Sequence, residues 1–184
     1  MKTLRKIMHL TPLLLFWLMI TVFFWSWIFT FLTDAPRKEK IVLFVECDVP
    51  ENTYIASRLE EFPSDVIRLA QVKPFSYSMM SSDAIRESDL YIVSESGFHE
   101  YFEWFAPLPE NAQAPGEVFV FNGIPYGFKA YDKETASGIL TKSIDYPAEN
   151  HYLVFGKSSL HLMGNENAVS DEAVNFARYL FEIE

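Results

Sequence analysis

The alternation of apolar and polar residues divides the chain into two parts. An uncharged apolar run extends from Leu10 to Leu32, behind a short leader that carries three basic residues. As a helix rising about 1.5 Å per residue, this run would span roughly 34 Å, which is enough to cross the hydrocarbon core of a bilayer. The pattern predicts a cytoplasmic leader over residues 1–9 and one transmembrane helix over residues 10–32.

A cleaved signal peptide is the alternative interpretation of this segment, with Thr33-Asp34-Ala35 as the cleavage site. Signal peptides have an apolar region of about 7–15 residues. This run is longer, and it ends in an aromatic stretch, Trp25 to Phe29, that is typical of a membrane interface. We therefore expect a retained signal anchor, with the membrane as a partner through residues 10–32.

The orientation of the anchor cannot be predicted by counting charges, because three basic residues stand on each side of it. A first apolar segment behind a short basic leader normally exports the part of the chain on its C-terminal side. We therefore predict a single-pass protein of the cell membrane whose C-terminal domain is extracytoplasmic.

Beyond a linker over residues 33–40, which contains Pro36, the pattern becomes that of a water-soluble domain over residues 41–184. A continuous apolar, β-branched run at 41–45 predicts a strand that is buried on both faces. Asp48-Val49-Pro50-Glu51 then predicts the start of a helix, with apolar residues at helical spacing as far as Phe62.

The remaining elements are predicted in the same way. They are strands at 66–72, 89–94 and 151–155, a short helix at 83–87, a hairpin of 118–121 and 126–131 around Asn122-Gly123, and a last helix that begins at Ser170-Asp171-Glu172. Strands that alternate with helices imply β-α-β crossovers. We therefore expect an α/β domain with a mostly parallel sheet and helices on its faces.

Composition adds a strong negative charge to this domain. The whole chain has 15 basic and 25 acidic residues, and the first forty residues hold six of the basic and two of the acidic ones. The rest of the chain therefore carries nine against twenty-three, a formal charge of −14. Such a surface repels phosphate backbones and anionic lipid, so we expect no nucleic-acid partner.

No motif in the chain predicts catalysis, a metal or a cofactor. Cys47 is the only cysteine, so an intramolecular disulfide and a four-thiolate zinc site are both impossible. The segment from His99 to Glu103 lacks the second histidine of a zinc-protease helix, and there is no nucleophile elbow or glycine-rich phosphate loop. His151 and His161 are predicted to make surface hydrogen bonds. We therefore expect no enzyme.

One edge of the predicted sheet gathers candidate ligand-binding residues. In an open parallel sheet, ligands collect outside the carboxyl ends of the strands. The residues there, or just beyond, are Asp48, Tyr77, Glu95, Ser96, Phe98, Tyr101 and Trp104. Aromatic rings beside carboxylates suit a sugar or a cation. The alternative is that Asp48 only caps a helix, Glu95 is solvated and the aromatic side chains pack the edge of the sheet.

The order of elements resembles the termini-bearing lobe of the extracellular solute-binding proteins that serve ABC transporters. The resemblance covers most of 41–184 and includes Asn122-Gly123-Ile124-Pro125-Tyr126-Gly127, Tyr131-Asp132-Lys133-Glu134-Thr135, Gly156-Lys157-Ser158-Ser159-Leu160-His161 and Asp171-Glu172-Ala173-Val174-Asn175-Phe176-Ala177. The chain departs from that family where the second lobe would be inserted, because only Thr135 to Asn150 stands there. The resemblance implies a single-lobe, periplasmic-binding-protein-like fold.

Two functions remain open from the sequence. The first is a non-catalytic, membrane-anchored solute-binding-like protein, accessory to an ABC-type transporter, that holds a small solute weakly. The second is a structural or interaction subunit of a cell-envelope complex that binds no small molecule. In both, an envelope or transporter protein is the expected partner.

Overall fold

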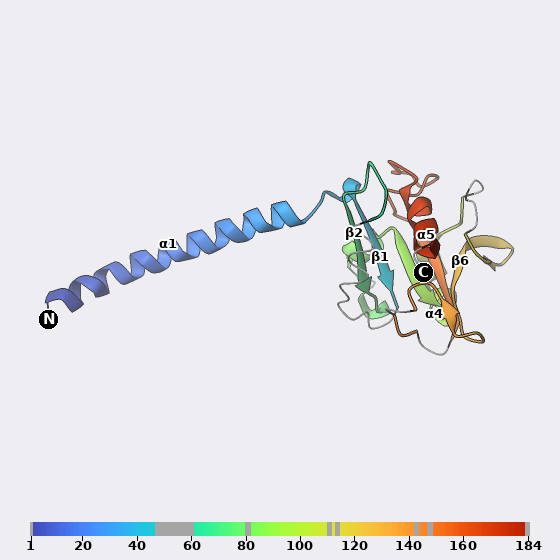
Figure 1. Cartoon of the computed structure of the whole chain (residues 1–184), viewed down its shortest axis with the longest axis horizontal. Helices are drawn as coiled ribbons and strands as arrows, with labels where there is room; N and C mark the ends of the chain where they lie inside the picture. The colour runs from blue at the N-terminus through green and yellow to red at the C-terminus, as the bar shows by residue number, and fades with distance from the viewer. Residues whose placement is uncertain are drawn as a thin grey trace. The chain divides into compact units, whose positions relative to one another are not determined.

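The computed structural model describes residues 2–46, 61–79, 82–109, 112, 115–141, 144–146 and 149–182 (Figure 1). It contains two compact units, Met1–Ala35 and Pro36–Glu184. The helix predicted after Asp48 falls largely outside the described residues, as do Cys47 and Asp48 themselves.

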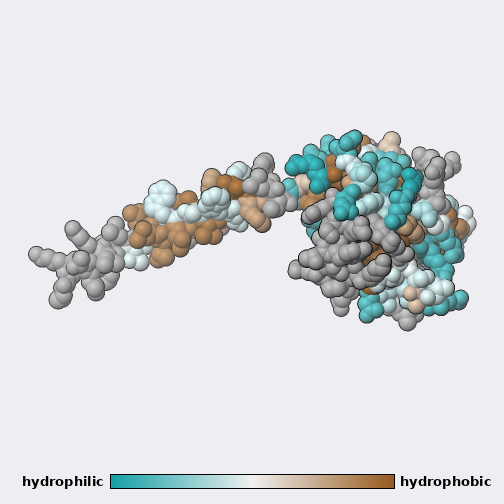
Figure 2. Space-filling model, in the orientation of Figure 1, coloured by the Kyte–Doolittle hydropathy of each residue, from teal (hydrophilic) through white to brown (hydrophobic). Residues whose placement is uncertain are grey.

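The first unit is one helix, α1 (Lys2–Thr33), with Pro12 inside it. The stretch Thr11–Thr30 is long and apolar enough to cross a membrane, with a mean hydropathy of 2.0 and none of its window buried. Figure 2 shows this stretch as a largely apolar rod. The predicted apolar helix is therefore confirmed as a helix, although a signal sequence near an N-terminus shares its length and composition.

The second unit is built on one sheet of eight strands. They are β1 (Lys40–Val45), β2 (Leu69–Pro74), β3 (Leu90–Ser94), β4 (Phe105–Ala106), β5 (Val118–Phe121), β6 (Ile124–Asp132), β7 (Ser137–Gly138) and β8 (His151–Gly156). The strand order is β2-β1-β3-β8-β6-β5, while β4 pairs with β8 and β7 pairs with β6. The edge strand β2 and the strand β6 lie on opposite sides of the domain in Figure 1.

Among the described residues, the helices of this unit are short except for the last. They are the 3-10 turns η1 (Arg37–Glu39), η2 (Tyr77–Met79) and η3 (Phe102–Trp104), and the α-helices α3 (Asp83–Arg86), α4 (Glu95–Tyr101) and α5 (Glu172–Glu182). The predicted short helix at 83–87 and the predicted last helix correspond to α3 and α5.

The prediction of a mostly parallel sheet was wrong, because the sheet is mixed. The strand β1 is parallel to β2 and to β3, as the crossovers predicted. The second half of the chain contributes β5, β6 and β8, whose pairs are all antiparallel. The chain leaves β6 at the edge where β3 ends, and β8 begins at that same edge. The strand β8 must therefore run antiparallel to both of its neighbours, β3 and β6.

Side chains from the sheet alternate between two cores. On one face, Ile41, Leu43 and Val45 of β1 pack in a cluster that includes Phe176 and Leu180 of α5. On the other face, an aromatic cluster includes Phe44 of β1, Tyr91 of β3, Phe98 of α4 and Tyr152 of β8. The central strands are therefore covered on both faces, which is why β1, β3 and β8 are nearly continuous apolar runs.

The predicted hairpin is confirmed. Asn122 and Gly123 have φ values of 51° and 79° between β5 and β6, the left-handed pair of a two-residue hairpin turn. The second predicted strand is shifted, because β2 runs from Leu69 to Pro74 and Val66 lies before it and is exposed. A terminal proline is tolerated there because β2 is an edge strand.

The predicted linker is partly fastened to the domain. The guanidinium of Arg37 donates hydrogen bonds to the carbonyls of Glu87 (3.0 Å) and Ser158 (2.9 Å), and it pairs with the Glu87 carboxylate. The imidazole of His161 lies against the same turn, with Nε2 3.3 Å from the Arg37 carbonyl and Nδ1 2.8 Å from Ser170 Oγ.

His161 belongs to a buried polar group at the amino ends of β1 and β3. The carboxylate of Asp89 accepts hydrogen bonds from the Val42 amide (3.2 Å) and from Ser159 Oγ (2.7 Å). Ser159 Oγ in turn accepts from the His161 amide. Burial raises the pKa of Asp89. We call Arg37, Asp89, Ser159, His161 and Ser170 the amino-end cluster. The prediction of a surface role for His161 was wrong, because its side chain is fully buried here.

Candidate functional site

The carboxyl ends of β1 and β3 meet at a half-buried carboxylate that the sequence did not single out. Glu46 follows β1, Tyr77 lies in η2, and Ser94 ends β3. One oxygen of Glu46 accepts hydrogen bonds from the Tyr77 hydroxyl (2.6 Å) and from the Ser94 amide (2.6 Å). These contacts fasten β1, β3 and the chain after β2 to one another at this edge.

The Tyr77 side chain packs at the carboxyl ends of β1 and β3, between Glu46 and α4. Its ring stacks on Tyr101, with centroids 4.5 Å apart and planes 11° apart. A Cβ atom at Gly97 would overlap the Tyr77 hydroxyl, so only glycine leaves room for it. Burial, followed by the hydrogen bond to Glu46, raises the pKa of Tyr77, so the phenol stays protonated and acts as a donor. The Tyr77 side chain therefore occupies the space between Glu46 and Gly97.

The segment after β3, predicted as a loop, begins a helix at once. Ser94 is the N-cap of α4, and its side chain accepts a hydrogen bond from the Gly97 amide at 3.1 Å. The Ser94 hydroxyl is 3.2 Å from Ser96 Oγ, which donates to the Glu149 carboxylate at 3.1 Å. The caps and hydroxyls here link the helix start to the segment that leads into β8.

The predicted aromatic site residues are divided between the core and its margin. Phe98 is fully buried and contacts Phe105, Phe119 and Tyr126. Trp104 is half-buried, and the Arg86 guanidinium lies 5.6 Å from the centre of its ring. The packing interpretation therefore describes Phe98, and the structure does not bring it onto a ligand face with Glu95 and Ser96.

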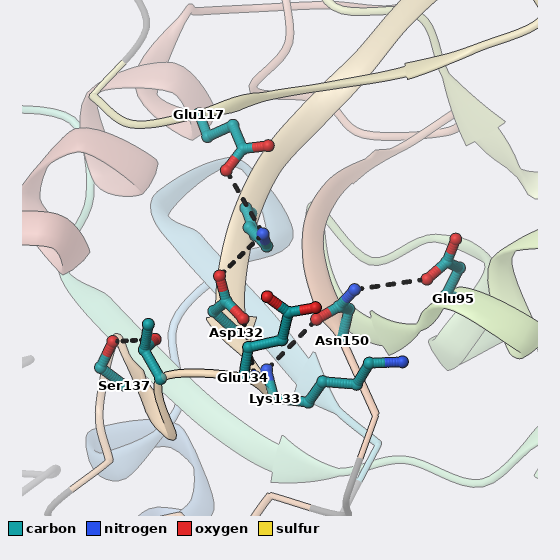
Figure 3. Close-up of polar contacts among 9 residues, drawn as sticks. Glu95, Glu117, Asp132, Lys133, Glu134, Ser137 and Asn150 are labelled. Carbon is teal, nitrogen blue, oxygen red and sulfur yellow. Dashed lines mark hydrogen bonds and ion pairs between the residues drawn. The ribbon is translucent and has the colours of Figure 1, made fainter.

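The exposed rim of this edge is rich in carboxylates and amides (Figure 3). Asn150 joins two segments, because its Nδ2 lies 3.5 Å from Glu95 and its Oδ1 accepts from the Lys133 amide at 3.2 Å. The Lys129 ammonium lies between Asp132 (2.9 Å) and Glu117 (3.3 Å). The hydrogen bond to Asp132 raises the pKa of Lys129, and the hydrogen bond from Lys129 lowers the pKa of Asp132.

His151, at the start of β8, was predicted to lie at the surface, and this prediction was wrong. Its side chain is fully buried, and Nδ1 donates to the Glu149 carbonyl at 3.0 Å. Since that carbonyl can only accept, Nε2 carries the lone pair, and it has no hydrogen-bond partner among the described residues. The Tyr146 ring lies 5.1 Å from the imidazole. Burial lowers the pKa of His151, so the ring is neutral at pH 7.

We call this group the carboxyl-edge cluster; its members are Glu46, Tyr77, Ser94, Ser96, Glu149 and His151. Of these, the sequence singled out Tyr77 and Ser96 as site residues. Glu46 stands one residue after the first predicted strand, and that position is the signal that would have found it. Glu149 has no comparable signal.

The chemistry of this cluster is that of binding and positioning. Within the described ranges, no three histidine, cysteine or acidic side chains are grouped to hold a metal ion. The hydroxyl of Ser96 faces a carboxylate, and His151, the histidine of this cluster, uses Nδ1 on a backbone carbonyl. These contacts do not form the chain of nucleophile, base and orienting group that acyl transfer needs.

No family model matches the chain, and comparisons with curated proteins and with solved structures gave no significant match.

Proposed function

We propose that this chain is a non-catalytic, membrane-anchored interaction protein of the cell envelope, whose acidic extracytoplasmic domain docks on another protein. The observation that carries the proposal is the position of Tyr77 at the carboxyl ends of β1 and β3, where it bonds Glu46 and lies directly over Gly97. A ligand at this point of the sheet would have to displace Tyr77. The exposed surfaces of the domain are therefore the places left for contact with partners.

The anchor part of the proposal rests on α1. A helix of 32 residues that contains a 20-residue apolar stretch is what a retained single-pass anchor needs. The short basic leader before the apolar stretch supports export of the domain. The strong negative charge of the domain keeps it off anionic lipid, which leaves α1 as its membrane contact.

A weak solute-binding role beside an ABC-type transporter is the second candidate, and His151 is the observation that favours it. The Nε2 lone pair is fully buried and has no partner among the described residues, which is costly unless a donor satisfies it. A small donor-rich solute at this edge would supply the missing hydrogen bond. With one lobe to cover it, such a solute would bind with a dissociation constant of about 0.1 mM or weaker.

Site-specific photo-cross-linking of the full-length protein in native membranes tests the interaction role. A photoreactive residue would replace Ser96, Glu103, Glu134 or Met163, four exposed positions on different parts of the domain. The proposal predicts a discrete adduct with another protein from at least one position. Adducts with lipid alone, or none at any position, would argue against an interaction protein.

The topology requires its own measurement. Carbonate washing should leave the full-length chain in the membrane fraction, and protease added from the outside should digest the domain. A soluble form that starts near Pro36 would show that the apolar segment is a signal peptide and that the anchor is wrong.

A further inference from the structure

The two edge strands of the sheet, β2 and β5, differ in their residues. At one edge, β2 ends in Lys73 and Pro74, which are exposed and are residues that discourage a further strand from pairing. At the other edge, β5 reads Val-Phe-Val-Phe, with neither a charge nor a proline. In the described part of the chain, β6 is its only strand partner. Within the described residues, β5 is protected only by its shortness and by the register shift between Phe119 and Val120, and it has no charge or proline to discourage strand addition.

Apolar side chains remain exposed along β5 on both faces of the sheet. Val118 and Val120 are 38% and 55% exposed, and Ile124 across the turn is 44% exposed. On the face of α4, Phe121 is half-buried and its ring contacts Phe102, which is exposed. A segment laid along β5 would therefore meet apolar surface above and below its backbone.

Ring contacts on both sides of the register shift between Phe119 and Val120 hold β5 against the sheet. The Phe119 ring stacks on Tyr152 of β8, with centroids 3.9 Å and planes 20° apart. The Phe121 ring packs edge-on against the fully buried Phe98 at 5.4 Å. Because these contacts already order β5, a partner strand would not have to supply that ordering, which favours affinity.

The charge around β5 indicates what kind of segment fits. Glu117 stands at its start with a side chain that is 71% exposed, and Glu100 and Glu103 flank the exposed Phe102. The domain beyond residue 40 carries a formal charge of −14, so a second copy of the chain would bring like charge to this edge. A segment with lysine or arginine between its apolar residues complements both the acidic ends and the apolar middle.

We propose that β5 is a strand-addition site that takes an extended, basic segment of a partner protein as the next strand of the sheet. Backbone hydrogen bonds to the free edge of β5 supply affinity, and alternate apolar side chains of the partner cover Val118 and Val120. Its basic side chains reach Glu117 and Glu103. This inference rests on the proposed interaction function and adds the surface and the chemistry of the partner.

Peptide binding to the full-length protein in nanodiscs tests the site. The probe is a labelled ten-residue peptide of alternating valine and lysine, compared with a glutamate-for-lysine version and with a version N-methylated on one edge of its backbone. Fluorescence anisotropy should show binding of the first peptide, with at least tenfold weaker binding of both others. Equal binding of the N-methylated peptide would overturn strand addition, and equal binding of the acidic peptide would overturn the charge match.

Two variants locate the site. Val120→Ser should weaken binding about five- to tenfold by removing apolar contact, whereas Val169→Ser, at a similarly exposed valine outside the sheet, should leave it unchanged. Equal loss in both variants would place the peptide elsewhere. A dimer that disappears in Val120→Ser would instead show that the occupant is a second copy. Equal binding of the peptide to empty nanodiscs would show that the lipid binds it.

The same position separates this inference from the function on which it rests. A photoreactive residue at Val120 should give a protein adduct in native membranes. Adducts from Ser96, Glu134 or Met163 but none from Val120 or Glu103 would leave the interaction function standing and exclude β5 as its site. No protein adduct at any of the five would exclude both.

Discussion

The two polar clusters of the domain lie at opposite ends of β1 and β3, and they differ in how completely they are satisfied. In the amino-end cluster, Asp89 accepts from Val42 and Ser159, and both nitrogens of His161 have partners. In the carboxyl-edge cluster, Glu46 is equally well bonded, but Nε2 of His151 has no partner among the described residues.

The difference distinguishes polar groups that only stabilise the fold from polar groups that could still bind a partner. A buried polar group that is fully bonded stabilises one fold and offers nothing to a ligand, whereas an unsatisfied one is costly and invites a donor. The amino-end cluster therefore holds the chain entering the domain against its C-terminal part. The carboxyl-edge cluster combines a structural half, around Glu46 and Tyr77, with a rim that is open to solvent.

The largest effect should come from Asp89→Ala in the amino-end cluster. The substitution leaves the Val42 amide and the Ser159 hydroxyl without their acceptor, and we expect a loss of about 3 kcal/mol in the free energy of unfolding. Chemical denaturation measures it. Glu149→Ala at the exposed rim of the other cluster is the control, with an expected loss of about 0.5 kcal/mol or less. Equal losses would end the distinction between the clusters.

The pH dependence of stability sharpens the comparison at His151. Because burial lowers its pKa, the unfolded chain takes up this proton first, near its ordinary pKa of about 6.5. The contribution of His151 is therefore fully present above that pH, and it is lost as the pH falls towards the lower folded-state pKa. Denaturation midpoints between pH 7.5 and 5.5 should fall more steeply for the wild type than for His151→Gln.

Asp89 contributes with the opposite sign, because its raised pKa makes the folded state take up a proton before the unfolded state does. Its contribution therefore rises as the pH falls, and it is present in both the wild type and His151→Gln. Subtracting the two curves isolates His151. Identical curves would mean that folding leaves the pKa of His151 unchanged, so that its imidazole is not shielded from water.

Tyr77→Phe should have a smaller effect. It removes the hydroxyl that donates to Glu46 but keeps the ring that stacks on Tyr101, and the Ser94 amide still bonds the carboxylate. We expect a loss of about 1 kcal/mol in the free energy of unfolding. A loss above about 3 kcal/mol would mean that Glu46 depends on this single donor.

The smallest effect is expected for Ser96→Ala. Its hydroxyl is exposed and bonds the Glu149 carboxylate at the rim, where water replaces the lost partner. The free energy of unfolding should change by about 0.5 kcal/mol or less. A large loss would place Ser96 in the structural half of the cluster, and the rim would no longer be distinct from it.

Much of the fold could be predicted from local pattern. The strands β1, β3 and β8 are apolar runs that the cores on both faces require, and Asn122-Gly123 specifies the hairpin because both residues take positive φ. The direction of the strands could not be predicted, because it depends on the end of the sheet at which the chain begins each new strand. The helix α4 was also missed, because Gly97 weakens helical propensity and the contact with Tyr77 that requires glycine comes from twenty residues away.

The candidate site was predictable only where sequence neighbours carry it. Tyr77, Glu95 and Ser96 follow predicted strands, so their edge could be named in advance. The bond from Tyr77 to Glu46 joins residues 31 positions apart, and that from Ser96 to Glu149 joins residues 53 apart. Neither pairing has a local signal. The same is true of His151, whose burial depends on the packing of Tyr131 and Tyr146 around it.

The claim that Tyr77 prevents a ligand from binding at the carboxyl ends of β1 and β3 is tested most directly by ligand-induced stabilisation. The melting temperature of the full-length protein in nanodiscs would be measured with millimolar sugars, amino acids, short peptides and divalent cations. A ligand at about 100 times its dissociation constant stabilises the native state by about 2.7 kcal/mol, so tight binding cannot be missed. We predict no rise above the buffer control. A clear rise with one solute at micromolar concentration, abolished by Glu46→Gln or His151→Gln, would contradict this claim and make this chain a solute-binding protein.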